Sequence, residues 1–268
     1  PGNVVVCRVG TGSLRLTNAA TEVFLDEYTP AGALVNTIAM PVAASGANNA
    51  LTANGTATTE CQLTRSANGN YLIVTGYNAV PGTANPSGIS TATIQRVIGR
   101  VDASGGIDTS TTTTAFSASN IRSATADDGL NYWAVGANSG VVYLSHGGSG
   151  GGTIISTTVT NNRSVNIFGG QLYVSGVSGT PRLSTVGTGL PTTSGQTITS
   201  IPGAPAGTPN QYFFADLDAG TPGLDTLYIA DEGAAGPNPN SGGVKKYALV
   251  AGSWTFLGIF PASVSPAI

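Results

Sequence analysis

The chain contains a single histidine, so a catalytic triad or a zinc site would have to include it. His146 ends an apolar segment and precedes a glycine-rich loop, without the strand-to-helix elbow that presents a serine nucleophile. One histidine and two distant cysteines also cannot supply an ordinary zinc ligand set. The sequence therefore predicts that His146 lies in a surface loop and has no catalytic or metal-binding role.

Paired carboxylates are the groups that a polysaccharide-cleaving enzyme needs, about 5 Å or about 6.5 to 9.5 Å apart across a cleft. The candidate pairs are Asp26-Glu27, Asp127-Asp128 and Asp231-Glu232. Asp128 precedes Gly129, which is typical of a hairpin turn, and Asp231 stands where other repeat units have a strand-end glycine. Turn and strand-end roles are favoured, and a glycosidase with acids among Asp127, Asp128, Asp231 and Glu232 is the alternative.

The segment 216–225 alternates acidic and small residues in the manner of a calcium loop. Asp216, Asp218 and Asp225 would be the ligands. Ala219 and Gly220 stand where a full loop would carry further oxygen ligands, so the competing interpretation is two Asx-type turns beside a hairpin. The sequence predicts no obligatory cofactor and leaves calcium as an option.

An Arg-Ser pair recurs before three predicted hairpin turns, at Arg65, Arg122 and Arg163. If these residues lie on the innermost strands of a propeller, the three guanidinium groups point to its axis and can grip a carboxylate or sulfate. The alternative is that each arginine spans a seam between units and binds loop carbonyl groups. Recurrence at one repeat position favours the structural role.

Two cysteines, Cys7 and Cys61, are present. A chain with few charges and many Thr, Ser and Gly residues is typical of the cell exterior, where disulfides form, so a Cys7–Cys61 bond is favoured over two free buried thiols. Four aromatic residues are candidates for stacking on sugars: Tyr77, Tyr132, Trp133 and Trp254. The repeat position of Tyr132 and Trp133 assigns those two to the core first.

The composition points to strands and turns. Only 9% of the 268 residues are charged, 40% are hydrophobic, and the chain contains 38 glycines. Thr, Val, Ile and Tyr suit strands, and Gly and Asn suit turns. The net charge of −3 offers no basic field for nucleic acid, and no apolar stretch is long enough to span a bilayer.

Self-similarity is the main indication of the fold. Four segments, starting at Asn70, Asn131, Gln171 and Thr226, share an aromatic-apolar strand pattern after a turn. Their spacing of roughly 40 to 60 residues is in the range of propeller blades with about four strands each. We therefore expect a single all-β domain, a β-propeller with about five blade-like units at 3–41, 60–116, 120–156, 162–190 and 211–260, or part of a larger propeller.

Three motifs resemble those of secreted bacterial β-propeller-like repeat proteins of poorly defined function. These are Val23 to Tyr28 with the turn at 29–32, Asn120 to Ala124, and Asp225 to Asp231. The resemblance covers nearly the whole chain and implies a secreted or cell-surface propeller, without catalytic residues to transfer. The resemblance also implies that the chain continues beyond residue 268 into further blades or an anchor. The residues 261–266 after the unit at 211–260 contain no closing strand, so the sequence itself predicts that this unit is a fragment.

These observations favour a non-enzymatic extracellular module for adhesion, glycan recognition or structural assembly. Its expected partners are glycans or other surface-protein subunits. The scarcity of charge is in keeping with packing into a larger assembly, because a free monomer normally relies on more charges for solubility.

Overall fold

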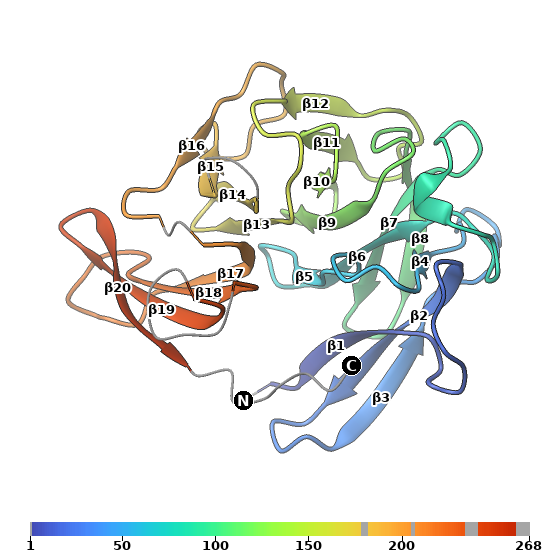
Figure 1. Ribbon diagram of the computed structural model, residues 1–268, viewed down its shortest axis with the longest axis horizontal. Coiled ribbons are helices and arrows are strands. Elements are labelled where there is room, and N and C mark those ends of the chain that lie inside the picture. Colours follow the sequence, from blue (N-terminus) through green and yellow to red (C-terminus); the bar gives the residue numbers. More distant parts are fainter. Residues whose placement is uncertain (1, 178–181, 205–206, 234–240, 261–268) are drawn as a thin grey trace.

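The computed structural model describes residues 2–177, 182–204, 207–233 and 241–260 (Figure 1). The described residues form an all-β fold, in which the one helical element is a 3-10 turn at Pro86–Gly88. The predicted all-β class is confirmed. No helix in this part of the chain is long and apolar enough to cross a membrane.

The first sheet contains eight antiparallel strands in the order β1-β2-β4-β6-β7-β8, with β3 beside β2 and β5 beside β6. These strands are β1 (Val4–Val9), β2 (Ala20–Tyr28), β3 (Leu34–Ala39), β4 (Thr52–Asn54), β5 (Thr64–Arg65), β6 (Tyr71–Tyr77), β7 (Arg96–Asp102) and β8 (Ile107–Thr113). Strand β4 pairs with both β2 and β6. It thereby joins the units expected at 3–41 and 60–116 into one sheet.

Three four-stranded antiparallel sheets follow, each built from consecutive strands. The second sheet contains β9 (Ile121–Ala126), β10 (Asn131–Gly136), β11 (Val141–Ser145) and β12 (Thr153–Ser156). The third contains β13 (Ser164–Phe168), β14 (Gln171–Ser175), β15 (Leu183–Val186) and β16 (Ile198–Ser200). The fourth contains β17 (Pro209–Ala215), β18 (Thr226–Asp231), β19 (Gly243–Val250) and β20 (Ser253–Phe260).

The four aligned segments of the sequence lie in β6, β10, β14 and β18, the second strands of their hairpins. Two details differ from expectation. The predicted unit at 162–190 is too short, because it omits the fourth strand, β16. That strand carries no clear signal in the sequence, since Ile198 is its one apolar residue beside a threonine and a serine. The last unit has a closing strand after all, since β20 pairs with β19 along its length.

Apolar side chains fill the seams between neighbouring sheets. Strand β10 shows the arrangement, because Tyr132 and Ala134 pack toward the first sheet while Trp133 and Val135 pack toward the third. The seam between the third and fourth sheets contains aromatic residues from both sides, including Tyr173 and Phe214 with ring centroids 4.6 Å apart. Burial of each large side chain contributes about 1.5 to 3 kcal/mol, so these seams hold the sheets in place.

The sheets fan out around a centre, with β1, β5, β9, β13 and β17 innermost (Figure 1). Among the described residues the fan does not close, because β20 pairs there only with β19 and β1 only with β2. Among the described strands no pairing joins the fourth sheet to β1, β2 or β3, and we call this break in the fan the open sector.

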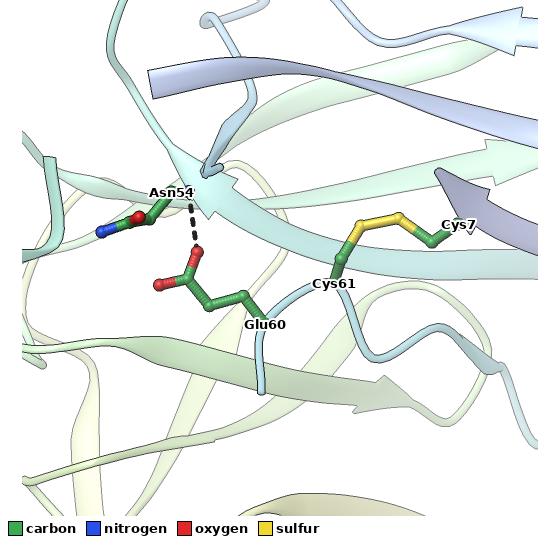
Figure 2. The surroundings of a disulfide bond; sticks show 4 residues. All are labelled: Cys7, Asn54, Glu60 and Cys61. Atoms are coloured by element: carbon green, nitrogen blue, oxygen red, sulfur yellow. Dashed lines mark hydrogen bonds between the residues drawn. A yellow bond between two sulfur atoms is a disulfide. The ribbon is translucent and has the colours of Figure 1, made fainter. Parts of the chain in front are cut away.

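A disulfide joins Cys7 on β1 to Cys61 in the segment before β5, as predicted (Figure 2). Cys61 has φ of 59°, in the left-handed region that residues with a Cβ rarely adopt. The neighbouring Glu60 accepts a hydrogen bond from the Asn54 backbone amide at 2.9 Å (Figure 2). It accepts further bonds from the Tyr77 hydroxyl and the Asn120 side chain. Burial raises the pKa of the Glu60 carboxyl in spite of these bonds.

Candidate binding surface

Two adjoining cavities of about 500 Å³ and about 1,070 Å³ lie beside the innermost strands. We call them together the central cleft. They share the lining residues Leu63, Thr64, Arg65, Gln211 and Phe213, so they meet along β5 and β17. The larger cavity also follows β1 from Val4 to Cys7. The cleft therefore reaches the open sector of the fan.

The fourth sheet has one covered and one uncovered face. Tyr212 and Phe214 of β17 pack into the seam with the third sheet, whereas the alternate residue Phe213 is 57% exposed. Strand pairing places Tyr228, Val244 and Phe260 on the face of Phe213. Val244 and Phe260 are 45% and 55% exposed. We call Phe213, Tyr228, Val244 and Phe260 the C-terminal face.

The first sheet has a corresponding uncovered face on β1 and β2. Val5, Cys7 and Val9 pack into the core of the first sheet, whereas Val4 and Val6 are 54% and 47% exposed. Strand pairing places Tyr28 opposite Val4. We call Val4, Val6 and Tyr28 the N-terminal face.

An ion pair lies within the N-terminal face, because Asp26 pairs with Val6 and Arg8 follows Val6 on the same side of β1. Arg8 binds Asp26 at 2.5 Å, and its guanidinium group lies over the ring of Phe24, 4.3 Å from the centroid. The hydrogen bond from Arg8 lowers the pKa of the Asp26 carboxyl. The two charges compensate each other, so the N-terminal face contains an ion pair among its apolar residues.

Arg65 is exposed and lines both cavities of the central cleft. Its Nε and Nη2 donate to the Gly69 carbonyl oxygen at 2.9 and 2.6 Å. Gly69 has φ of 77°, and a Cβ there would lie 2.8 Å from Arg65 Nη2. The glycine therefore allows the hairpin turn to hold the guanidinium group at the border of the cleft.

Arg122 and Arg163 lie near each other and apart from the cleft. Arg122 is buried and donates to Thr59 Oγ1, Asn161 Oδ1 and the Asn162 carbonyl oxygen. Burial and the positive charge of Arg163 lower the pKa of Arg122 to about 10. The bonds of Arg122 reach segments on both sides of its sheet, which is the seam-spanning role that the sequence offered as an alternative.

The Arg-Ser pairs do not share one register. Ser123 pairs with Val135 and Ser164 with Ser175, in each case the residue before the aligned glycine. In the first unit Gln62 takes that place, and it forms a parallel bridge with Ser123. Position 61 is the equivalent of Arg122, and Arg65 lies four residues nearer its turn. The structure therefore brings Arg122 and Arg163 together and leaves Arg65 elsewhere. Anion binding by these arginines stays a prediction.

The candidate catalytic carboxylates lie at separate places. Asp127 and Asp128 form the turn after β9, where Asp127 accepts bonds from the turn and from Asn131. Asp231 ends β18 and pairs with Lys245 at 2.7 Å, with both side chains fully buried. Glu232 lies 3.5 Å from Arg163. None of these acids lines either cavity of the central cleft.

The proposed calcium ligands are engaged in turn hydrogen bonds. Asp225 accepts bonds from the amides of Leu217 and Asp218 and from the Thr226 hydroxyl. Asp218 accepts bonds from Gly220 and Thr221. Within the described ranges no group of three acidic, histidine or cysteine side chains is arranged to hold a metal ion. Calcium binding by Asp216, Asp218 and Asp225 stays a prediction.

The aromatic residues expected to stack on sugars are buried. Tyr77, Tyr132 and Trp133 are at most 1% exposed, and Trp254 is 8% exposed. The assignment of Tyr132 and Trp133 to the core is confirmed, and stacking on sugars by Tyr77 and Trp254 is contradicted, because all four side chains fill seams between sheets. His146 is partly exposed, as expected, and its Nε2 lies 2.7 Å from Asp108 Oδ2.

Sequence reasoning missed the two apolar faces, although the sequence contains a signal for them. The runs Val4-Val5-Val6 and Tyr212-Phe213-Phe214 are continuously apolar, which is typical of strands covered on both faces. Each of these strands is covered on one face only. The open faces, and not a cluster of charged groups, are the distinctive surface of this molecule.

No protein-family model matches the chain, and no curated protein shows significant similarity to it. Its function has to be argued from the surfaces described above.

Proposed function

We propose that this protein is a non-enzymatic module of the cell exterior, built as an open β-propeller, and that it functions by assembling with protein subunits. The observation that carries the proposal is the pair of uncovered apolar faces beside the central cleft. Contiguous exposed apolar surface of this kind marks interaction sites in folded proteins.

The arrangement of the sheets supports a propeller. Four-stranded antiparallel sheets are radially placed, their first strands are innermost, and their cores lie between neighbours (Figure 1). The second, third and fourth sheets thus have the connectivity and packing that support their interpretation as blades. The open sector distinguishes this molecule from a closed ring.

The disulfide supports a location outside the cytoplasm, because disulfides persist in oxidising compartments. Assembly has more support than glycan recognition, since Tyr77 and Trp254, the two candidates for stacking on sugars that the repeat did not assign to the core, are buried. It also has more support than polysaccharide cleavage, which needs two carboxylates converging on one cleft.

The experiment is to compare surface retention in cells that make the protein. We expect the double variant Phe213→Asp/Val244→Asp to move from the cell-surface fraction to the medium by at least tenfold, because unpartnered charges disfavour burial in an apolar contact. Ile154→Asp, which changes a residue of β12 that is 44% exposed, is the matched control and should stay at the surface. Equal retention of all three proteins on immunoblots would contradict the proposal.

A further inference from the structure

We propose that the central cleft is a binding site for a small aromatic carboxylate. Its smaller cavity, of about 500 Å³, holds the aromatic body of the ligand, and Arg65 binds the carboxylate group. This inference adds a small-molecule ligand to the proposed assembly function and does not depend on that function.

The smaller cavity has the size and the lining of a small-molecule site. Such sites are concave, have volumes of about 300 to 1,000 Å³, and combine apolar walls with a few polar groups. Four aromatic residues belong to the lining: Phe168, Tyr212, Phe213 and Tyr228. Phe213 is 57% exposed, so its ring is available for contact with a ligand. Because aromatic rings pack well in offset or edge-to-face contact, these walls favour an aromatic ligand.

The charge of the lining favours an anion. Arg65 is the one charged residue among the described residues that line the two cavities of the central cleft. Lys246 adds a positive charge nearby, with its Nζ 5.9 Å from the ring centroid of Tyr228. Arg65 also lines a separate cavity of about 240 Å³ with Glu27 and Asp102, but neither acid lines the central cleft. Arg65 forms no ion pair with any of the described acids.

The guanidinium group of Arg65 is fixed on one side and available on the other. Its Nε and Nη2 donate to the Gly69 carbonyl oxygen, whereas its Nη1 donates to none of the described residues. A guanidinium group binds a carboxylate through two parallel N–H bonds, and Nη1 and Nη2 each have a hydrogen available for this. Gln211 is exposed and lines both cavities with Arg65, so its amide is a further donor. The carboxylate therefore lies where the two cavities meet.

The test is isothermal titration calorimetry of the purified full chain with 2-naphthoate and with its neutral analogue, 2-naphthamide. We expect 2-naphthoate to bind at one site, and 2-naphthamide at least tenfold more weakly, because the amide lacks the charge that pairs with Arg65. Arg65→Gln should lower the affinity for 2-naphthoate at least tenfold and should retain the circular dichroism of the unmodified chain, since Arg65 is exposed. Arg15→Gln removes an exposed arginine outside the cleft lining and is the matched control, which should bind 2-naphthoate like the unmodified chain.

Three outcomes would overturn the inference. The first is an unmodified chain that does not bind 2-naphthoate at about 1 mM. The second is equal affinity of Arg65→Gln and the unmodified chain for 2-naphthoate. The third is equal affinity of the unmodified chain for the two compounds, because the cleft would then recognise apolar surface alone. None of these outcomes bears on retention at the cell surface, so the proposed assembly function is tested separately.

Discussion

Asp108 connects the single histidine of the chain to the first sheet. Its Oδ1 accepts bonds from the amide and the hydroxyl of Ser110, and its Oδ2 lies 2.7 Å from His146 and 3.2 Å from Arg100. Burial alone would raise the pKa of the Asp108 carboxyl. The bonds from Ser110 and His146 outweigh burial and lower this pKa to about 2.

We expect Asp108 to contribute to the loss of folding stability at acid pH. A carboxyl group with a lowered pKa stabilises the folded state above its unfolded pKa of 3.8, and this contribution is lost as pH falls toward about 2. Asp108→Asn should therefore lower the free energy of unfolding by about 1 kcal/mol at pH 6, after allowance for solvent screening of a partly exposed pair. The difference should vanish near pH 2. Urea unfolding between pH 2 and pH 6 measures it, and parallel curves for the two proteins would refute this role.

Arg65 shows that the same dipeptide can recur in several repeat units without occupying equivalent positions in their strands. The Arg-Ser dipeptide looks alike in three units, but strand pairing sets which residues are equivalent, and Gln62 stands at the level of Ser123. A short β5, only Thr64–Arg65, places Arg65 directly before its turn. The similarity of the three dipeptides suggests a ring of arginines. Only the pairing of the strands decides whether the three arginines occupy equivalent positions.

At the scale of elements, the disulfide is the covalent link between β1 and the segment before β5. Cys7 and Cys61 are 54 residues apart in the sequence and close a loop that contains β2, β3 and β4. Cross-linking a loop of this length removes conformational entropy from the unfolded chain, worth about 4 kcal/mol in the chain-entropy model. Strand β1 has few other restraints on its inner side, because it borders the central cleft.

We expect Cys7→Ser/Cys61→Ser to lower the free energy of unfolding by about 2 to 4 kcal/mol in urea titrations. Reduction of the unmodified chain by dithiothreitol should have a similar effect, and the same treatment should not change the double variant. A double variant as stable as the oxidised chain would show that packing alone holds β1.

At the scale of the whole molecule, an open fan makes the end sheets less protected than the middle ones. The second sheet has neighbours on both faces, whereas the first and fourth sheets each have an uncovered apolar face. Local opening free energies follow such burial. The ends of the fan should therefore open more easily than its centre.

Hydrogen exchange followed by mass spectrometry measures this difference. In dilute protein, amides of β10 and β14 should exchange at least tenfold more slowly than those of β1 and β18. Uniform protection across the four sheets in dilute protein would argue against an open fan.

Much of the architecture could be predicted from local signals. Glycine turns followed by aromatic-apolar strands located the hairpins of β6, β10, β14 and β18, because strand alternation and turn chemistry act within a few residues. The Cys7–Cys61 bond could be favoured from compartment and composition. The fourth strand β16 was missed, because one isoleucine among polar residues carries no periodic signal.

The sequence by itself determined the strand content, the repeat and the two cysteines available for pairing, since these depend on residue type and short-range spacing. Only the tertiary structure decided which faces are covered. Phe213 and Trp133 occupy similar apolar strands, yet one is 57% exposed and the other 1% exposed. The difference arises because covering a face requires a neighbouring sheet, and the fan places one beside Trp133 and leaves the open sector beside Phe213.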